Sequence, residues 1–274
     1  MHRIHVSVVL FYLCSMIFTD THAHLYLDAF DPDRREMVGR AVDAGVKYLL
    51  IPNIDKDSID SMQALCDAFP DICFPMMGLH PTSVKEDYRE QLKRVEDQLA
   101  SGRKYIALGE IGIDLYWDKT FQSLQEEAFG YQLHLADRYN LPVAIHTRNS
   151  VDRVLDILTE RKEQNNKGVF HCFGGNLAQG KRATELGFLL GIGGVVTYKN
   201  SGLQQVVEAI PLEFLLLETD APFLPPVPHR GERNESAYIP LIASKIAEIR
   251  KISVEEVADV TTRNAAALFR IPLS

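Results

Sequence analysis

The sequence has little that would cross-link the chain. Its 274 residues include only four cysteines, which are scattered and form no Cys-x-x-Cys pair. This pattern favours reduced thiols in a cytosol over a disulfide framework or a zinc knuckle. A chain of this length can bury about three quarters of its unfolded surface, so it needs no structural metal to fold. Any bound metal would therefore serve function.

The sequence also lacks an excess of basic residues. The formal net charge of −8 argues against a broad surface for duplex nucleic acid, because such binding rests on many phosphate contacts. A small positive pocket, or a pocket built from metal ions, is compatible with this charge. No linker, repeat or low-complexity segment interrupts the chain, so we expect a single domain over residues 16–274.

The opening apolar run, MHRIHVSVVLFYLCSMIF, is too short for a comfortable membrane span and has no clean small-residue cleavage site. Cleavage near THAH would destroy the pair formed by His22 and His24. We therefore interpret residues 1–15 as an extension upstream of a working start at Met16, with a weak signal-like segment as the alternative. The expected protein is a cytoplasmic monomer without a membrane partner.

Eight apolar runs of strand length alternate with helical patterns. Several runs are apolar on both faces, as strands of a covered parallel sheet are. Gly45 has the position of a helix C-cap, and Ser253 with Glu256 has the pattern of a capping box. The order predicts an α/β fold, a (β/α)8 TIM barrel, with strands at residues 17–24, 47–54, 73–80, 105–112, 141–147, 168–173, 188–194 and 214–220.

Ionisable residues stand at the ends of most of these runs. The carboxyl ends of barrel strands meet at one mouth, where active sites are built. Alternation of side chains along a strand would place His22 and His24 on one face. A single histidine of this kind is often satisfied by a backbone carbonyl, but so many at matching positions are hard to explain in that way. The set comprises His22, His24, His80, Glu110, His146, His171 and Asp220.

Imidazole and carboxylate donors without thiolate suit zinc, manganese and similar divalent ions. Buried together without a cation, the carboxylates would be costly. The donors are too many for one catalytic ion, which typically takes three protein ligands and keeps a position open. The residues therefore predict two divalent ions bridged by one carboxylate.

Six motifs then resemble, in order, those of the TatD-related metal-dependent deoxyribonucleases, within the amidohydrolase-like barrel superfamily: TDTHAHL, GLHP, GEIGID, IHTR, HCFGG and LLETDAPFL with RGERNE. The resemblance runs from about Met16 to Phe269. The His-x-His opening is shared by many amidohydrolases. The glutamate of the fourth strand, ETDAP and the arginine-rich loop are specific to this family, which often has proline in place of Ser236.

The resemblance implies a barrel of the metal-dependent hydrolase type with two metal sites bridged by Glu110. The other ligands would be His22, His24 and Asp220 for one ion and His146 and His171 for the second. Asp220 would also orient or deprotonate the attacking water, so Asp220 and Glu110 are the implied catalytic residues. The implied ions are Mg²⁺ or Mn²⁺, with Zn²⁺ possible.

The activity that the resemblance implies is a deoxyribonuclease, specifically a 3′-to-5′ exonuclease on single-stranded DNA ends that works by attack of metal-bound hydroxide. The residues alone reach a two-metal hydrolase, and the step to DNA rests on the family. An amide, ester or lactone hydrolase and an aminoacyl-tRNA deacylase stay open as alternatives. A catalytically idle binding protein is disfavoured, because every expected ligand is present.

Three arginines are candidates for contacts with the substrate. Arg148 could reach a phosphate oxygen in the mouth, for which its fork geometry is suited, or form a salt bridge at a strand end. Arg230 and Arg233 could bind phosphate or hold their loop in place through Glu235, and the second role is favoured.

Other candidates lie beside the predicted ligands. His80 is expected near the substrate without ligating metal. Trp117 could stack on a base or simply pack against the protein, and Asp114 lies close to it. Glu218 shares a strand face with Asp220 and could support the metal ligands from behind.

Overall fold

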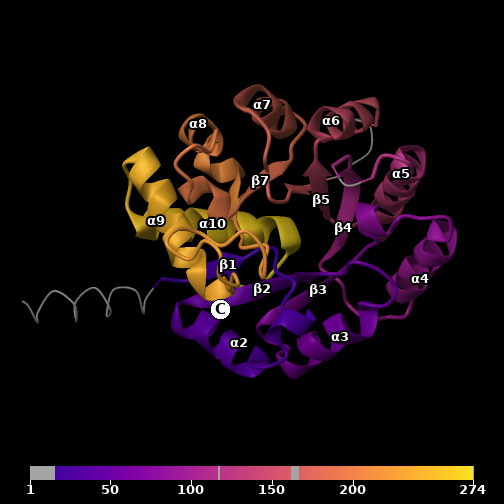
Figure 1. The fold of residues 1–274 in the computed structure, drawn as a ribbon, viewed down its shortest axis with the longest axis horizontal. Coiled ribbons are helices and arrows are strands. Elements are labelled where there is room, and N and C mark those ends of the chain that lie inside the picture. Colours follow the sequence, from indigo (N-terminus) through magenta and orange to yellow (C-terminus); the bar gives the residue numbers. More distant parts are fainter. Residues whose placement is uncertain (1–15, 117, 162–166, 274) are drawn as a thin grey trace, which may run out of the picture.

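A computed structural model describes residues 16–116, 118–161 and 167–273. Eight parallel strands form one sheet in the order of the sequence, β1 to β8 (Figure 1). This confirms the predicted (β/α)8 barrel. The interpretation of residues 1–15 falls outside the described residues. The strands are β1 Phe18–Asp20, β2 Val46–Pro52, β3 Cys73–Met77, β4 Ala107–Asp114, β5 Val143–Arg148, β6 Gly168–Phe170, β7 Leu189–Ile192 and β8 Leu215–Leu217.

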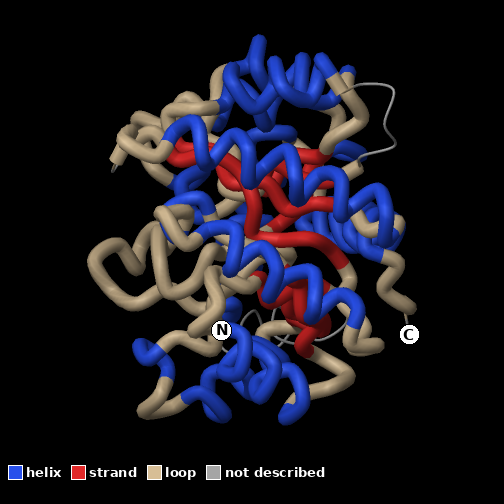
Figure 2. Tube along the Cα trace, turned by 90° about the vertical axis from the view of Figure 1, so that its right-hand side faces the viewer, coloured by secondary structure: helices blue, strands red, loops and turns tan. Residues whose placement is uncertain are grey.

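Helices follow the strands and lie outside them, as the turned view in Figure 2 shows. In the described part of the chain, no helix is both long and apolar enough to cross a membrane. Short 3₁₀ helices are η1 Asp28–Phe30, η2 Pro81–Ser83, η3 Gly194–Thr197, η4 Leu212–Phe214 and η5 Ser236–Tyr238. The α-helices are α2 Arg34–Asp43, α3 Ile59–Ala68, α4 Tyr88–Ala100, α5 Gln122–Tyr139, α6 Val151–Glu160, α7 Leu177–Glu185, α8 Leu203–Ala209, α9 Ile239–Arg250 and α10 Val254–Phe269.

Two helix termini follow the sequence signals. Gly45 lies just past the end of α2 with φ +87°, a conformation that glycine adopts without a steric penalty. At the start of α10, Ser253 Oγ accepts a hydrogen bond from the Glu256 N–H at 3.1 Å. This bond satisfies one of the donors that the first turn of a helix leaves without a partner.

Backbone hydrogen bonds bring the first and last strands together. The Thr21 N–H donates to the Leu217 carbonyl at 3.0 Å, and the Asp220 N–H donates to the His22 carbonyl at 2.9 Å. An isolated parallel bridge joins Ala23 to Ala221. These bonds nearly close the barrel and align the two segments that carry His22 and Asp220.

The strands divide the apolar side chains into two clusters. Leu49 and Ile145 belong to the larger cluster, which includes the apolar faces of the surrounding helices. Ala144 and Val169 belong to a smaller cluster that also contains Phe269 of α10. Because side chains alternate along a strand, the next positions on the face of Ala144 and Val169 are His146 and His171. The inner face therefore changes from apolar to ionisable toward the carboxyl ends of the strands.

Six of the eight strands end earlier than predicted, whereas β4 and β5 end later, at Asp114 and Arg148, which corrects these boundaries. Runs predicted to reach residues 24, 80, 173 and 220 leave the sheet after Asp20, Met77, Phe170 and Leu217. The predicted ionisable residues of these four runs therefore lie on loops, whereas Glu110 and His146 lie within β4 and β5. The difference arises because an apolar pattern reports burial, and the chain stays buried in the mouth after its ladder hydrogen bonds have ended.

Candidate metal centre

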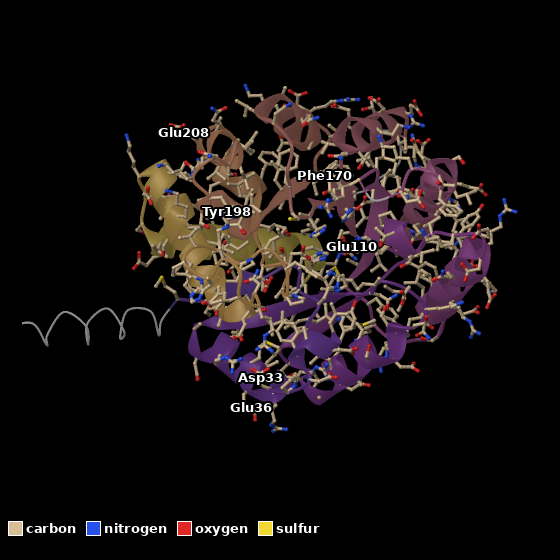
Figure 3. The ribbon with its side chains drawn as sticks, in the orientation of Figure 1. Asp33, Glu36, Glu110, Phe170, Tyr198 and Glu208 are labelled. Atoms are coloured by element: carbon tan, nitrogen blue, oxygen red, sulfur yellow. The ribbon has the colours of Figure 1, made fainter. Side chains whose placement is uncertain are left out.

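Glu110 lies at the centre of the mouth and is 2% exposed (Figure 3). Its Oε1 lies 2.8 Å from His146 Nδ1 and 2.8 Å from His171 Nε2. Its Oε2 lies 3.2 Å from His22 Nε2 and 3.3 Å from His24 Nε2. One carboxylate thus presents an oxygen to each of two histidine pairs, which is the arrangement that a bridging ligand requires.

Asp220 completes the group that contains His22 and His24. Its Oδ1 lies 3.6 Å from His24 Nε2 and 3.9 Å from His22 Nε2. The structure therefore brings all six predicted metal ligands into one cluster, although they come from distant parts of the sequence. Three overlapping sets have ligand atoms within 4.8 Å of one another, namely His22 with His24 and Asp220, His22 with Glu110 and His171, and His80 with Glu110 and His146.

His80 lies closer to this cluster than the sequence indicated. Its Nε2 lies 3.2 Å from Glu110 Oε1 and 3.3 Å from His146 Nδ1, and its ring packs edge-on against that of His146. Its Nδ1 contacts Thr82 Oγ1 at 2.6 Å, which fixes the ring orientation. His80 therefore stands beside the carboxylate oxygen that His146 and His171 also face.

Burial and mutual charge shift the acid–base equilibria of the cluster. Burial raises the pKa of Asp220 to about 6 and lowers the pKa of His22 well below its usual value. Burial alone would raise the pKa of Glu110, but the charges of His171 and His80 outweigh it and hold that pKa well below its usual range. Burial likewise opposes protonation of His171, yet Glu110 raises the pKa of His171 well above normal.

The donor set fits divalent metal ions. Imidazole nitrogens and carboxylate oxygens converge here at 2.8–3.9 Å, and Arg148 is the only arginine or lysine among the described residues that line the pocket. Within the described part of the chain, the buried Nδ1 atoms of His22 and His171 and the Oε2 of Glu218 have no hydrogen-bond partner. Carboxylates buried in this way are costly unless a cation neutralises them.

Asp114 and Glu218 support the histidines from behind. Asp114 Oδ2 contacts His146 Nε2 at 2.9 Å, which leaves Nδ1 of that ring directed at Glu110. Glu218 is fully buried, its Oε1 accepts a hydrogen bond from the Cys172 N–H, and the same oxygen lies 3.5 Å from His171 Nδ1. A Cβ at position 191 would lie 2.1 Å from Glu218 Oε2, so Gly191 makes room for this carboxylate.

Asp20 is a buried residue that the sequence reasoning missed. Its Oδ1 accepts a hydrogen bond from the Thr219 N–H at 3.0 Å, and its Oδ2 accepts from Thr219 Oγ1 and Ser236 Oγ, each at 2.6 Å. Asp20 thereby ties the segment before His22 to the segment before Asp220. The only signal in the sequence was its position at the end of an apolar run. By that criterion Asp20 belonged with the other ionisable residues at the ends of the predicted strands.

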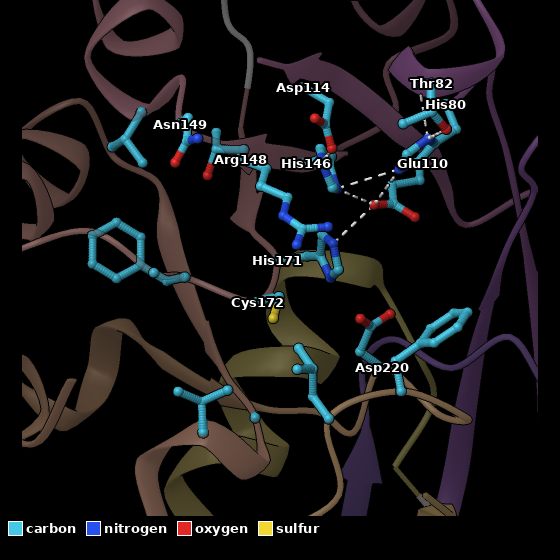
Figure 4. A pocket seen from close by; sticks show the side chains of 18 of the residues that line it. His80, Thr82, Glu110, Asp114, His146, Arg148, Asn149, His171, Cys172 and Asp220 are labelled. Atoms are coloured by element: carbon cyan, nitrogen blue, oxygen red, sulfur yellow. Dashed lines mark hydrogen bonds and ion pairs between the residues drawn. The ribbon is translucent and has the colours of Figure 1, made fainter. Parts of the chain in front are cut away.

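The predicted substrate contacts fall in different places. Arg148 lines the pocket (Figure 4). Its guanidinium lies 3.8 Å from the centre of the Tyr116 ring. Arg230 lies over the ring of Tyr198 at 4.4 Å and is not among the residues that line the pocket. Trp117 is outside the described residues.

Arg233 takes part in an arginine–carboxylate network with Asp33, Arg40 and Glu235. It contacts Asp33 Oδ1 and Glu235 Oε1, each at 2.7 Å, and Arg40 pairs with the same two carboxylates at 2.7 and 2.8 Å. The network joins α2 to the loop after β8. The structure thus places Arg233 in the loop-holding position that the sequence favoured rather than in the pocket.

Known proteins of one family match this chain over nearly its whole length. A profile of the family described as "TatD related DNase" matches residues 19–270. The uncharacterized metal-dependent hydrolase YabD of Bacillus subtilis is 37% identical over 92% of this chain and 98% of its own length. The "3'-5' ssDNA/RNA exonuclease TatD" of Pectobacterium parmentieri is 33% identical over 92% of this chain and 99% of its own.

A solved structure agrees with these sequence matches. The TatD homologue YjjV of Escherichia coli superimposes with a TM-score of 0.88 at 32% identity and covers 93% of this chain and 98% of its own. The resemblance inferred from the sequence motifs is confirmed. The chain belongs to the TatD-related DNase family of metal-dependent hydrolases.

Proposed function

We propose that the protein is a two-metal deoxyribonuclease that removes nucleotides from single-stranded DNA ends in the 3′-to-5′ direction. The observation that carries the proposal is that the two carboxylate oxygens of Glu110 face different histidine pairs. Oε1 faces His146 and His171, and Oε2 faces His22 and His24. The name of the Pectobacterium relative supports the choice of substrate and polarity.

The two ions would share Glu110. His22, His24 and Asp220 would complete the first site. His146 and His171, each 2.8 Å from Glu110 Oε1, would complete the second. Mg²⁺ or Mn²⁺ is the expected occupant, and Zn²⁺ also suits these donors. When bound, the ions would supply Lewis acidity and positive charge for the phosphoryl oxygens.

The side chains of this chain would then position water and substrate. Asp220 lines the pocket and can hold the attacking water and take up its proton. The water oxygen forms the new bond to phosphorus, the bond from phosphorus to the 3′-oxygen of the upstream nucleotide breaks, and that oxygen takes up a proton. Arg148, exposed on the pocket wall, can contact a non-bridging phosphate oxygen.

The free thiols of Cys66, Cys73 and Cys172 support a reducing compartment, and we infer a cytoplasmic location. Burial raises the pKa of all three thiols, which disfavours a nucleophilic role. We also infer that the enzyme acts as a monomer, because all the proposed ligands come from one chain.

A hydrolysis assay tests this function. Single-stranded DNA labelled at its 5′ or its 3′ end would be incubated with Mg²⁺, Mn²⁺, Zn²⁺ or EDTA, beside a matched RNA. We expect the 5′-labelled strand to give a metal-dependent ladder that shortens from the 3′ end. The Glu110→Ala protein, purified in the same way, controls for contaminating nuclease. Intact DNA under every metal, together with turnover of amides, esters or aminoacyl-tRNA, would contradict the proposal.

A further inference from the structure

The pocket extends well beyond the metal centre. Its volume is about 680 Å³, within the range of sites that enclose a small organic molecule. In Figure 4 the labelled ionisable side chains gather on one side, and most of the side chains drawn without nitrogen or oxygen lie away from Glu110. Val151, Phe173, Val195, Leu203 and Leu224 are among the apolar residues that line the pocket, and we call the part of the pocket that these five line the apolar lobe.

The apolar lobe adjoins the metal centre along three loops. Phe173 follows His171 by two residues, Leu224 follows Asp220 by four, and Val151 follows His146 by five. Two residues of extended chain span at most about 7 Å, so an occupant of the lobe would stand directly beside a group bound at the metal centre. Arg148, between His146 and Val151 in the sequence, lines the same pocket.

One wall of the lobe is held in place by contacts between η3 and the loop after β8. A Cβ at Gly194 would lie 2.3 Å from the Leu224 carbonyl oxygen, so the two backbones touch. The Val227 N–H donates to Thr197 Oγ1 at 2.9 Å, and the Tyr198 hydroxyl donates to the Pro225 carbonyl at 2.9 Å. The lobe is therefore a formed cavity whose wall does not depend on a ligand.

The chemistry of the lobe defines what it can hold. The five side chains that define it contain no hydrogen-bond donor or acceptor, so they favour a group with large apolar faces. The neighbouring metal centre and Arg148 favour a phosphate. A nucleotide combines the two, because its base is joined to its phosphate by a single sugar.

We propose that the apolar lobe is the subsite for the nucleobase of the terminal nucleotide, whose phosphate lies at the metal centre. This inference rests on the proposed nuclease function. It adds that the lobe determines which nucleobases the enzyme prefers at the end of the strand. The five side chains that define the lobe have no polar group to read a base edge, and Asn149, which also lines the pocket, is outside this set. The lobe itself therefore distinguishes bases by stacking area rather than by hydrogen-bonding pattern. Purines are therefore held more tightly than pyrimidines, and adenine and guanine are held about equally.

Binding to the Mn²⁺-loaded protein tests the lobe by calorimetry. The probes are deoxyadenosine 5′-monophosphate, 2-deoxyribose 5-phosphate, which lacks the base, and octyl phosphate, which carries a flexible chain. We expect the base to tighten binding by about tenfold, the scale of one base stacked on a protein surface. Octyl phosphate should bind more weakly than the nucleotide.

Two variants fill the lobe without touching the predicted metal ligands. Val195→Trp acts from η3 and Val151→Trp from the first turn of α6, and both residues are only partly buried. Each should abolish the advantage of the nucleotide over deoxyribose phosphate and leave binding of deoxyribose phosphate unchanged. Val42→Trp, on an exposed face of α2 outside the pocket, is the matched control and should keep the full advantage.

Three results would overturn the assignment. They are equal affinity for the nucleotide and deoxyribose phosphate, an advantage that survives both tryptophan variants with intact folds by circular dichroism, and tighter binding of octyl phosphate than of the nucleotide. The last would assign the lobe to an apolar chain. Since the readout is binding, a wrong lobe assignment is distinguishable from a wrong function: DNA is still cleaved in the first case and stays intact in the second.

Discussion

Two clusters of carboxylates in this protein are built from the same residue types and behave differently. In the arginine–carboxylate network, Asp33 and Glu235 each contact Arg40 and Arg233 at 2.7–2.8 Å. In the mouth of the barrel, Glu110 and Asp220 face histidines. Arginine carries a permanent positive charge, whereas a histidine is charged only when it is protonated.

The difference is visible in the acid–base equilibria. Hydrogen bonds from Arg233 and Arg40 hold the pKa of Asp33 well below its usual value. Burial raises the pKa of Asp220 to about 6. The negative charges of the network are therefore balanced by its two arginines. In the mouth, a divalent cation would balance the charge of the carboxylates. Four substitutions and one change of pH test this contrast, beginning with the largest expected effect.

Glu110→Ala removes the carboxylate that, alone among the described residues, faces both histidine pairs. We expect hydrolysis to fall by about 10³-fold or more, the scale of losing a main electrostatic stabiliser. The thermal midpoint without metal should stay near that of the wild type, because the apolar core does not include this residue. Enzyme kinetics and thermal unfolding with and without Mn²⁺ measure both effects. A variant that hydrolyses DNA at the wild-type rate would rule out the bridging role.

Asp220→Asn keeps the shape of the side chain and removes its charge. Hydrolysis should fall by about 10²–10⁴-fold, the range for loss of a positioned general base. Circular dichroism should be unchanged. Strong activity in this variant would exclude Asp220 as the group that takes up the proton of water.

Asp114→Asn tests the support of a predicted ligand. Because Asp114 Oδ2 lies 2.9 Å from His146 Nε2, the amide would lose the charge that fixes the orientation of this ring. Metal affinity should fall by about 10–100-fold, the usual cost of changing such a partner. Metal titration followed by calorimetry measures this directly, and turnover at saturating metal should largely recover. Asp118→Asn, a change at a partly exposed aspartate nearby that does not line the pocket, is the control.

Arg233→Ala breaks the other cluster. Leaving Asp33 and Glu235 short of one partner should lower the free energy of unfolding by about 1–3 kcal/mol. Metal affinity should change by less than about twofold, since the two clusters share no residue. Denaturant unfolding and metal titration give the two numbers. A large loss of metal affinity would mean that the network also shapes the mouth.

Acid should remove the stabilising effect of the network. The folded-state pKa values of Asp33 and Glu235 are depressed, so their contribution is fully present above their unfolded pKa values of about 4 and is lost as the pH falls through the folded values. The difference in unfolding free energy between the wild type and Arg233→Ala should therefore shrink below about pH 4. A difference that stays constant down to pH 2 would contradict this assignment.

The sequence predicted the fold and the membership of the central cluster well, for a physical reason. Repeated apolar runs with ionisable ends specify both the inner face of a barrel and its mouth, because one two-residue period governs each strand. Ala144 with His146 and Val169 with His171 follow this period. The same pattern could not locate the ends of the strands, since burial continues into the loops.

Other features depended on contacts between distant segments. The sequence placed His80 near the substrate but could not show its contact with Glu110. That contact depends on the path of the chain between β3 and η2. Arg148 and Arg233 are both arginines close to predicted ligand-bearing segments, yet one lines the pocket and the other is paired with Asp33 across the α2 interface. The local sequence of an arginine does not reveal which carboxylate lies opposite it.

The residue pattern alone thus specified a barrel, an ionisable mouth and donors suited to divalent ions, because periodicity and donor chemistry are local properties of the chain. The barrel had to close before the two oxygens of Glu110 could face separate histidine pairs. Closure also joined Asp20 to Thr219 and Ser236 and formed the apolar lobe beside the mouth. These features depend on distances between strands and loops far apart in sequence, and folding in three dimensions sets those distances.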